Sequence, residues 1–248
     1  MEADTQVALA LASVRARIQQ AFQASTRTPA DVTIVAVTKG FGAEAIESAL
    51  AAGLRDIGEN YYKEAAEKFH RISWPSGNKR HFIGRVQRNK ARRIAALFDM
   101  VQTVDDLEVA GGLERGAASA GKVLDVLVQV NVASDQRQGI PPDLLGDFVQ
   151  ALAQHRHLRV RGLMAMGPNN PAAAAEAFAR AAACFERVRA DVPNASILSM
   201  GMSDDMDLAL AHGSTMLRLG TALFGPRPGL STIGFRAVTD EHQSPGGR

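Results

Sequence analysis

Lys39 stands at the end of a β-rich segment, where its amine could react with a small molecule. It follows residues 32–38 and shares a strand face with Val35 and Val37, because side chains alternate along a strand. A lysine amine that loses solvent has a lowered pKa and can form a Schiff base with a carbonyl group. The alternative is a lysine that extends past the strand end into water.

Arg218 occupies a corresponding place in the last β-rich segment. It shares a face with Gly220, whereas Leu217 and Leu219 share the opposite face and suit a layer of helices. A buried arginine needs an acceptor, which a ligand or a carboxylate would supply. Glu59 is the candidate carboxylate for a purely structural pair. Gly220 would let the backbone approach a ligand closely.

A phosphate-binding group is predicted near the last two strands, where phosphates commonly bind in barrels. Ser203 is a suitable N-cap for the helix that follows, and free amides at such a position attract anions. Ser203, Gly220 and Thr221 could together hold the phosphate. Asp204 and Asp205 must then point away, and a plain N-cap is the alternative.

Asn60 and a basic cluster complete the candidate groups. Asn60 follows the second β-rich segment and offers both a hydrogen-bond donor and an acceptor. The basic cluster is Arg85, Arg88, Lys90, Arg92 and Arg93. These cations could form a solvated helix face or a surface for an anionic partner.

These groups together predict a phosphorylated aldehyde as the ligand. Pyridoxal 5′-phosphate (PLP) has an aldehyde for the lysine, a phosphate for the cradle and a ring nitrogen that needs a polar partner. The sequence holds no C-x-x-C, H-E-x-x-H or G-x-S-x-G motif, so we expect neither a metal site nor a serine triad.

The elements that must position these groups alternate along the chain. A helix is predicted near residues 4–24, because apolar residues recur there at spacings of three and four. Further helices are predicted near residues 43–52, 61–69, 88–98, 106–119, 142–154, 172–190 and 204–212. Strands are predicted at residues 32–38, 55–59, 80–84, 100–104, 124–131, 158–166, 197–201 and 216–222.

Eight strands separated by helices predict a parallel sheet closed into a single (β/α)8 TIM-type barrel with an extra N-terminal helix. An open doubly wound sheet is the alternative, but no G-x-G-x-x-G follows the first strand. We expect the barrel to span residues 1–225. Residues 226–248 are predicted to form a flexible tail, because their apolar residues lack a clear period.

Composition and charge argue against some classes of protein. The 248 residues carry 28 Lys and Arg against 26 Asp and Glu, and a net charge of +2 argues against nucleic-acid binding. Cys184 is the only cysteine, which is consistent with a reducing, cytoplasmic location. No apolar run reaches the roughly 18 residues that a membrane helix needs, so we expect no membrane association.

The sequence resembles the PLP homeostasis protein family, which has the alanine racemase N-terminal barrel fold. The resemblance spans roughly residues 5–225 in order. It rests on residues 35–39, 58–61, 81–84, 198–206 and 213–216, and on Arg218, Gly220 and Thr221. One departure is the segment 40–42, where the family usually has a second lysine or a proline.

The resemblance implies a function in PLP homeostasis rather than catalysis. It implies that Lys39 carries PLP as a Schiff base, that Arg218 faces the pyridine nitrogen, and that Ser203, Gly220 and Thr221 hold the phosphate. The implied partners are PLP and PLP-dependent apo-enzymes, and the implied state is a monomer. No residue is expected to be catalytic, so the protein is not expected to be an enzyme.

Two enzymatic functions are alternatives. An amino-acid racemase of this fold type needs a second catalytic base, often a tyrosine from a further domain. Only about 25 residues follow the last strand here, and Tyr61 and Tyr62 are the only tyrosines. A Schiff-base aldolase would need a separate acid–base group, for which Glu59 is the only candidate.

Overall fold

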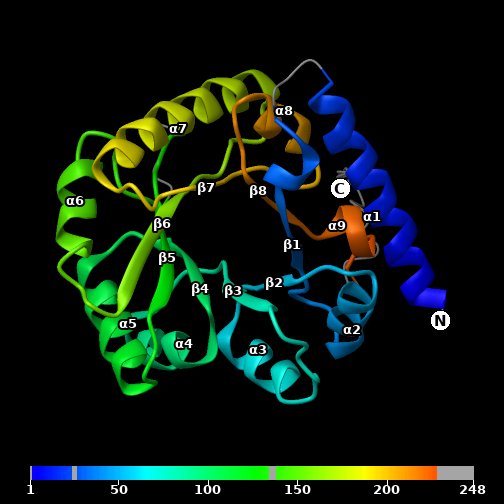
Figure 1. Cartoon of the computed structure of the whole chain (residues 1–248), viewed down its shortest axis with the longest axis horizontal. Helices are drawn as coiled ribbons and strands as arrows, with labels where there is room; N and C mark the ends of the chain where they lie inside the picture. The colour runs from blue at the N-terminus through cyan, green and yellow to red at the C-terminus, as the bar shows by residue number, and fades with distance from the viewer. Residues whose placement is uncertain (1, 24–26, 134–137, 228–248) are drawn as a thin grey trace, which may run out of the picture.

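The computed structural model describes residues 2–23, 27–133 and 138–227, and its eight parallel strands close into one barrel (Figure 1). Each strand pairs with the next in the sequence, and β8 pairs with β1. The predicted TIM-type barrel is therefore confirmed. The strands are β1 Thr33–Val37, β2 Asp56–Glu59, β3 Lys79–Phe82, β4 Met100–Val104, β5 Leu124–Gln129, β6 Leu158–Met164, β7 Ile197–Ser199 and β8 Met216–Leu219.

Helices connect the strands and surround the barrel (Figure 1). The α-helices are α1 Glu2–Ala21, α2 Ala43–Ala51, α3 Tyr62–Phe69, α4 Ala91–Leu97, α5 Leu107–Ser119, α6 Leu145–Leu152, α7 Pro171–Asp191, α8 Met206–Ala211 and α9 Thr221–Phe224. Two short 3-10 helices are η1 Pro29–Asp31 and η2 Arg88–Lys90. The strand predicted to reach residue 222 ends earlier, because α9 begins at Thr221.

The alternation of side chains on each strand separates two cores. Val35, Met100, Leu127, Met164 and Met216 pack together inside the barrel. Residues on the opposite strand faces, such as Ala36, Leu217 and Leu219, pack against the helices. The two faces predicted for the first and last strands are thus confirmed.

Helix α1 precedes the barrel and packs along its outside, beside α2, α8 and α9 (Figure 1). Its residues Val7, Leu11, Val14 and Ile18 are at most 5% exposed. Their spacing of three and four places them on one buried helix face.

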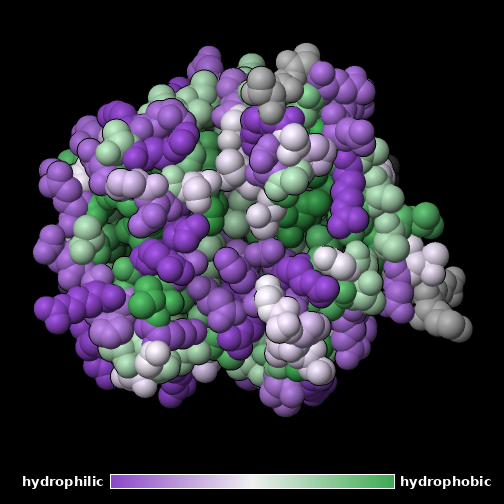
Figure 2. Space-filling view, in the orientation of Figure 1, coloured by the Kyte–Doolittle hydropathy of each residue, from purple (hydrophilic) through white to green (hydrophobic). Residues whose placement is uncertain are grey.

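The surface is mixed, with hydrophilic residues around most of the face seen in Figure 2. Among the described residues, large hydrophobic side chains are exposed on separate segments: Leu9, Tyr61, Leu107, Val123, Leu144 and Met202. No helix in the described part of the chain is long and apolar enough to cross a membrane. The predicted tail lies outside the described residues except for Pro226 and Arg227.

Candidate functional site

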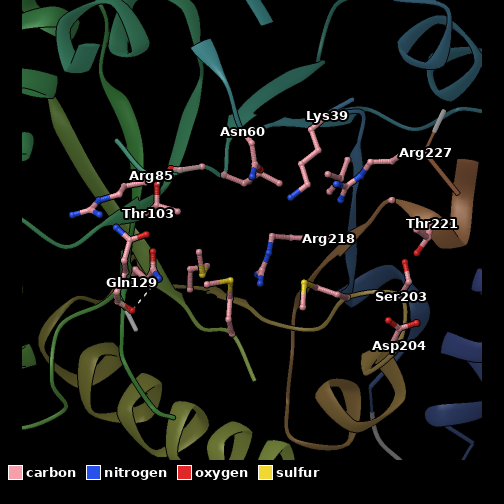
Figure 3. Close-up of a pocket in the computed structure, with 18 residues that line it drawn as sticks. Lys39, Asn60, Arg85, Thr103, Gln129, Ser203, Asp204, Arg218, Thr221 and Arg227 are labelled. Carbon is pink, nitrogen blue, oxygen red and sulfur yellow. Dashed lines mark hydrogen bonds between the residues drawn. The ribbon is translucent and has the colours of Figure 1, made fainter. Parts of the chain in front are cut away.

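A cavity of about 390 Å³ lies at the carboxyl ends of the strands (Figure 3). Functional groups gather at this end of a barrel, because every strand delivers its following loop there. All six predicted cofactor-binding residues border the cavity: Lys39, Asn60, Ser203, Arg218, Gly220 and Thr221. The structure therefore brings together side chains that are up to 182 positions apart in the sequence.

Lys39 extends from the end of β1 into this cavity, where Arg218 approaches it from β8 (Figure 3). Its side chain is partly buried, and burial is the main reason why the pKa of Lys39 is lowered. The positive charges of Arg227 and Arg218 lower this pKa further. A lowered pKa favours the neutral, nucleophilic amine that Schiff-base formation requires.

A buried charged cluster fixes the backbone on both sides of Lys39. Lys68 Nζ lies 2.5 Å from Glu59 Oε1, 2.8 Å from Glu64 Oε1 and 2.8 Å from the Thr38 carbonyl oxygen. The Thr38 hydroxyl donates to Glu59 Oε1 at 2.6 Å, and the Gly40 amide donates to Glu64 Oε1 at 2.6 Å. Burial raises the pKa of Glu59, against the opposing effect of Lys68.

This cluster also shows which groups bind Glu59. The alternative of a structural pair between Arg218 and Glu59 is not formed: Arg218 donates to Ser199 and Ala165, whereas Glu59 Oε1 binds Lys68 and Thr38. Lys68 was not among the predicted site residues. Its spacing of four from Glu64 is a helical ion-pair signal that could have identified it.

Arg218 is held inside the barrel by neutral acceptors. Its Nη1 donates to Ser199 Oγ at 2.7 Å and its Nη2 donates to the Ala165 carbonyl oxygen at 3.1 Å. Burial lowers the pKa of Arg218 to about 10, although Asp205 opposes this shift. The guanidinium therefore remains charged at neutral pH.

Ser203 lies beside the first turn of α9 (Figure 3). Its hydroxyl oxygen accepts a hydrogen bond from the Ala222 amide at 3.0 Å. This contact brings the Ser203 and Thr221 hydroxyls to the same side of the cavity, next to Gly220 (Figure 3). Two polar side chains and a residue without a side chain thus border one part of the cavity.

The predicted N-cap role of Ser203 is wrong, because α8 begins only at Met206 with Asp205 as its N-cap. Asp205 turns back and accepts a hydrogen bond from the Met202 amide at 2.5 Å. Asp204 does not turn away, since it borders the cavity, but its side chain is exposed to solvent. Solvent reduces the repulsion that this carboxylate would exert on a phosphate.

Asn60 provides an acceptor that the protein leaves unused. Its Oδ1 is buried and has no hydrogen-bond partner among the described residues. Gly84 packs so closely on Asn60 that a Cβ at position 84 would lie 2.1 Å from the Asn60 carbonyl oxygen. The glycine thus fixes the loop that carries Asn60, and a ligand with a donor would satisfy the free oxygen.

Arg227 is a cation of the site that sequence analysis missed, because it lies in the segment predicted to be a tail. It borders the cavity near Lys39 (Figure 3). Its Cδ lies 3.2 Å from the place where Gly40 would carry a Cβ. Gly40 has a φ of +76°, so this backbone position favours glycine and leaves room for the arginine. No periodicity marks Arg227 in the sequence.

The predicted basic cluster divides into parts with different surroundings. Arg85 borders the main cavity and, together with Lys90 and Lys63, a neighbouring cavity. Arg88 forms ion pairs with Asp106 and Glu108. The exposed Arg92 and Arg93 belong to α4 and border neither of these two cavities.

Other kinds of site have little support in the described residues. No group of three or more His, Cys, Asp or Glu side chains is placed to hold a metal within the described ranges. Tyr61 is 62% exposed and borders the neighbouring cavity instead of the main one. Tyr62 also borders the neighbouring cavity.

The fold and the site are those of one class of protein. The sequence matches the family "Alanine racemase, N-terminal domain" over residues 9–228. The Pseudomonas aeruginosa protein named pyridoxal phosphate homeostasis protein is 43% identical over 88% of this chain and 94% of its own length. The Escherichia coli K12 protein of the same name is 39% identical over 88% of this chain and 95% of its own length. The chain belongs to the alanine racemase N-terminal domain family and, within it, to the pyridoxal phosphate homeostasis proteins.

Solved structures show the same likeness. PipY of Synechococcus elongatus, solved without PLP, is 35% identical with a TM-score of 0.77, over 88% of this chain and 100% of its own. A second PipY structure, with PLP bound, is 34% identical with a TM-score of 0.76 over the same shares. Alanine racemase of Corynebacterium glutamicum is only 14% identical, with a TM-score of 0.69 over 93% of this chain and 63% of its own, so it supports the fold alone.

Proposed function

We propose that this protein binds PLP through a Schiff base on Lys39 and acts in PLP homeostasis as a carrier or regulator, without the turnover of a PLP enzyme. One observation carries the proposal: an amine with a lowered pKa and a buried arginine share a cavity with a pair of hydroxyls. The bound PLP in the PipY structure supports the choice of ligand. The names of the relatives support the role in homeostasis.

The residues of the cavity fit this ligand. PLP supplies an aldehyde, a pyridine ring that withdraws electrons, and a phosphate. Lys39 offers the amine, and the Ser203 and Thr221 hydroxyls can donate to phosphate oxygens. The free Asn60 oxygen can accept from a ligand hydroxyl. A volume of about 390 Å³ lies within the range of small-molecule sites.

The charge of Arg218 is compatible with a protein that holds PLP. With a pKa of about 10, it keeps its proton at neutral pH and can donate a hydrogen bond to the ring nitrogen without transferring a proton. The ring nitrogen then remains unprotonated and withdraws electrons less strongly. Alanine racemases share the arginine, so this residue alone does not separate the two functions.

The second base of a racemase is the discriminating feature. In the described part of the chain, neither Tyr61 nor Tyr62 borders the cavity that holds Lys39. Glu59, the acid–base candidate for an aldolase, does not border this cavity, and its Oε1 binds Lys68 and Thr38. Both arrangements favour a protein that holds PLP over one that transforms an amino acid or a sugar phosphate.

The remaining parts of the proposal concern the cellular context. We propose a cytoplasmic monomer that exchanges PLP with PLP-dependent apo-enzymes and binds neither nucleic acid nor membranes. The near-balanced charge supports the absence of nucleic-acid binding, and the single, buried Cys184 is consistent with a reducing compartment. The scattered exposed hydrophobic residues support a monomer.

A Lys39→Ala variant tests the attachment. We expect the wild-type protein with PLP to show a visible absorption band, and borohydride reduction to add the ligand mass to the peptide that contains Lys39. The variant should lose both signals, because alanine has no amine. Lys63→Ala is the matched control, since this lysine is 91% exposed on α3 and should leave both signals unchanged.

Three results would contradict the proposal. A band that persists in Lys39→Ala would show that another residue carries PLP. Racemisation of alanine or serine by the purified wild-type protein, lost in Lys39→Ala, would show an enzyme instead of a carrier. Borohydride trapping of a sugar phosphate in place of PLP would favour the aldolase.

A further inference from the structure

A continuous series of hydrogen bonds crosses the barrel interior and ends at Arg218. Arg218 Nη1 lies 2.7 Å from Ser199 Oγ, which lies 2.7 Å from Gln102 Oε1. Gln102 Nε2 lies 3.0 Å from His81 Nδ1, and His81 Nε2 lies 2.8 Å from Asp56 Oδ1. Five side chains from β2, β3, β4, β7 and β8 thus join a cation to a carboxylate.

With the Gln102 amide oxygen facing Ser199 and its nitrogen facing His81, each hydrogen bond has one direction. A guanidinium can only donate, so Ser199 Oγ accepts from Arg218 and its own proton is directed to Gln102 Oε1. The amide nitrogen of Gln102 then donates to His81 Nδ1. His81 must therefore carry its proton on Nε2, which it donates to Asp56. All four bonds point from Arg218 towards Asp56.

Burial makes these bonds costly to lose. His81, Gln102 and Ser199 are 0% exposed, and Arg218 is 5% exposed. A buried polar group without a partner loses its hydrogen bonds to water and forms no protein hydrogen bond to replace them. Gln102 donates in addition only to Met216 Sδ, a weak acceptor at 3.2 Å. The inner part of the series therefore has little freedom to rearrange.

The far end opens at the opposite mouth of the barrel. Asp56 and His81 border a cavity of about 250 Å³ there, with Lys79 and Arg161 also on its wall. The Asp56 side chain is 19% exposed. The series thus joins the solvent at the amino ends of the strands to the arginine at their carboxyl ends.

We propose that Gln102 and His81 are positioning residues for Arg218, which they orient through Ser199 in a polarised hydrogen-bond relay anchored by Asp56. The relay fixes two things at once: the direction in which Nη1 is held, and the tautomer of His81. Arg218 itself borders the cavity proposed for the ligand. The effect of the relay on PLP retention rests on the proposed function. Its effects on the His81 tautomer and on the orientation of Arg218 do not.

The protein without ligand supplies the first test. Nitrogen-15 NMR of the histidine ring should show His81 with its proton on Nε2. Gln102→Glu replaces the donor to Nδ1 by an acceptor, so the Nδ1 resonance should move from its wild-type position. Gln102→Leu removes both contacts and should speed exchange of the Arg218 guanidinium protons with water. Met100→Leu, another change in the barrel interior, is the control and should alter neither signal.

Ligand retention supplies the second test. Release of PLP on dilution should be roughly tenfold faster in Gln102→Leu than in the wild type, the lower end of what an outer hydrogen-bond partner contributes in metal sites. Arg218→Gln measures how much faster PLP is released when the arginine itself is lost. Gln102→Glu should restore slow release, because Glu can still accept from Ser199. Asp56→Asn replaces the carboxylate at the far end of the relay by a neutral acceptor, and should give an intermediate rate.

The results separate the relay from the proposed function. The relay is overturned if His81 carries its proton on Nδ1, or if a folded Gln102→Leu keeps both guanidinium exchange and PLP release unchanged. It is also overturned if Gln102→Glu behaves like Gln102→Leu. If the wild type binds no PLP, the proposed function fails, and the NMR signals alone decide the relay.

Discussion

At the scale of single residues, the pKa of Lys39 depends on groups that surround it from distant parts of the chain. Arg227 contributes to this pKa although it lies 188 positions away. Sequence reasoning identified Lys39 because strand alternation predicts which way a side chain points. It missed Arg227, because the contact depends on how an irregular segment packs against Gly40.

The influence of Arg227 can be measured through the titration of Lys39. Its positive charge lowers the pKa of Lys39, so Arg227→Gln should raise that pKa towards the ordinary value of 10.5. The fraction of reactive amine at pH 8 should then fall. Acylation of Lys39 by a neutral reagent, followed by mass spectrometry across a pH series, measures the midpoint.

The exposed Arg92→Gln serves as a control for loss of a positive charge. The Lys39 midpoint should stay at its wild-type pH in this variant. An unchanged midpoint in Arg227→Gln would show that Arg227 does not act on the amine. Because burial is the main cause of the lowered pKa, part of the shift should remain in Arg227→Gln.

At the scale of elements, the predicted strands and most helices are confirmed, because each has a clear hydrophobic period or a β-rich composition. The discrepancies are short. Residues 88–98 divide into η2 and α4, and α9 has only four residues. The partners of Arg218 were beyond sequence reasoning, because Ser199 and Ala165 come to lie beside it only through strand pairing in the closed barrel.

The buried ion pair between Glu59 of β2 and Lys68 of α3 gives a prediction about stability. Lys68→Met would leave Glu59 buried beside no cation, and breaking a buried pair costs about 3–5 kcal/mol of the free energy of unfolding. The pKa of Glu59 is already raised by burial, and removal of Lys68 raises it further. Urea unfolding at pH 7 measures the loss.

The sign of the pH effect follows from proton binding. A carboxyl group whose pKa is raised on folding binds more protons in the folded state, so stability falls as pH rises above the unfolded value of 4.5. The loss in Lys68→Met should therefore be smaller near pH 5 than at pH 7. Lys63→Met is the control on the same helix, and an equal loss there would contradict a specific role for the buried pair.

At the scale of the whole molecule, the polar surface leads to a prediction about assembly. The described residues expose large hydrophobic side chains only on separate segments, and such scattered groups do not form the apolar core of a stable interface. We expect sedimentation at micromolar concentration to give a mass near 26.4 kDa. A concentration-independent dimer would contradict this expectation.

The pairing of β1 with β8, which closes the barrel, has a consequence for when the binding site forms during folding. Strand β8 pairs with β1 so that Arg218 lies opposite Val35, which is how residues 39 and 218 come to share one cavity. Loop closure over so long a stretch of chain is slow and is completed late in folding. A chain that has not yet docked its last strand therefore has no complete site, and ligand that binds only the closed barrel must stabilise the closure itself.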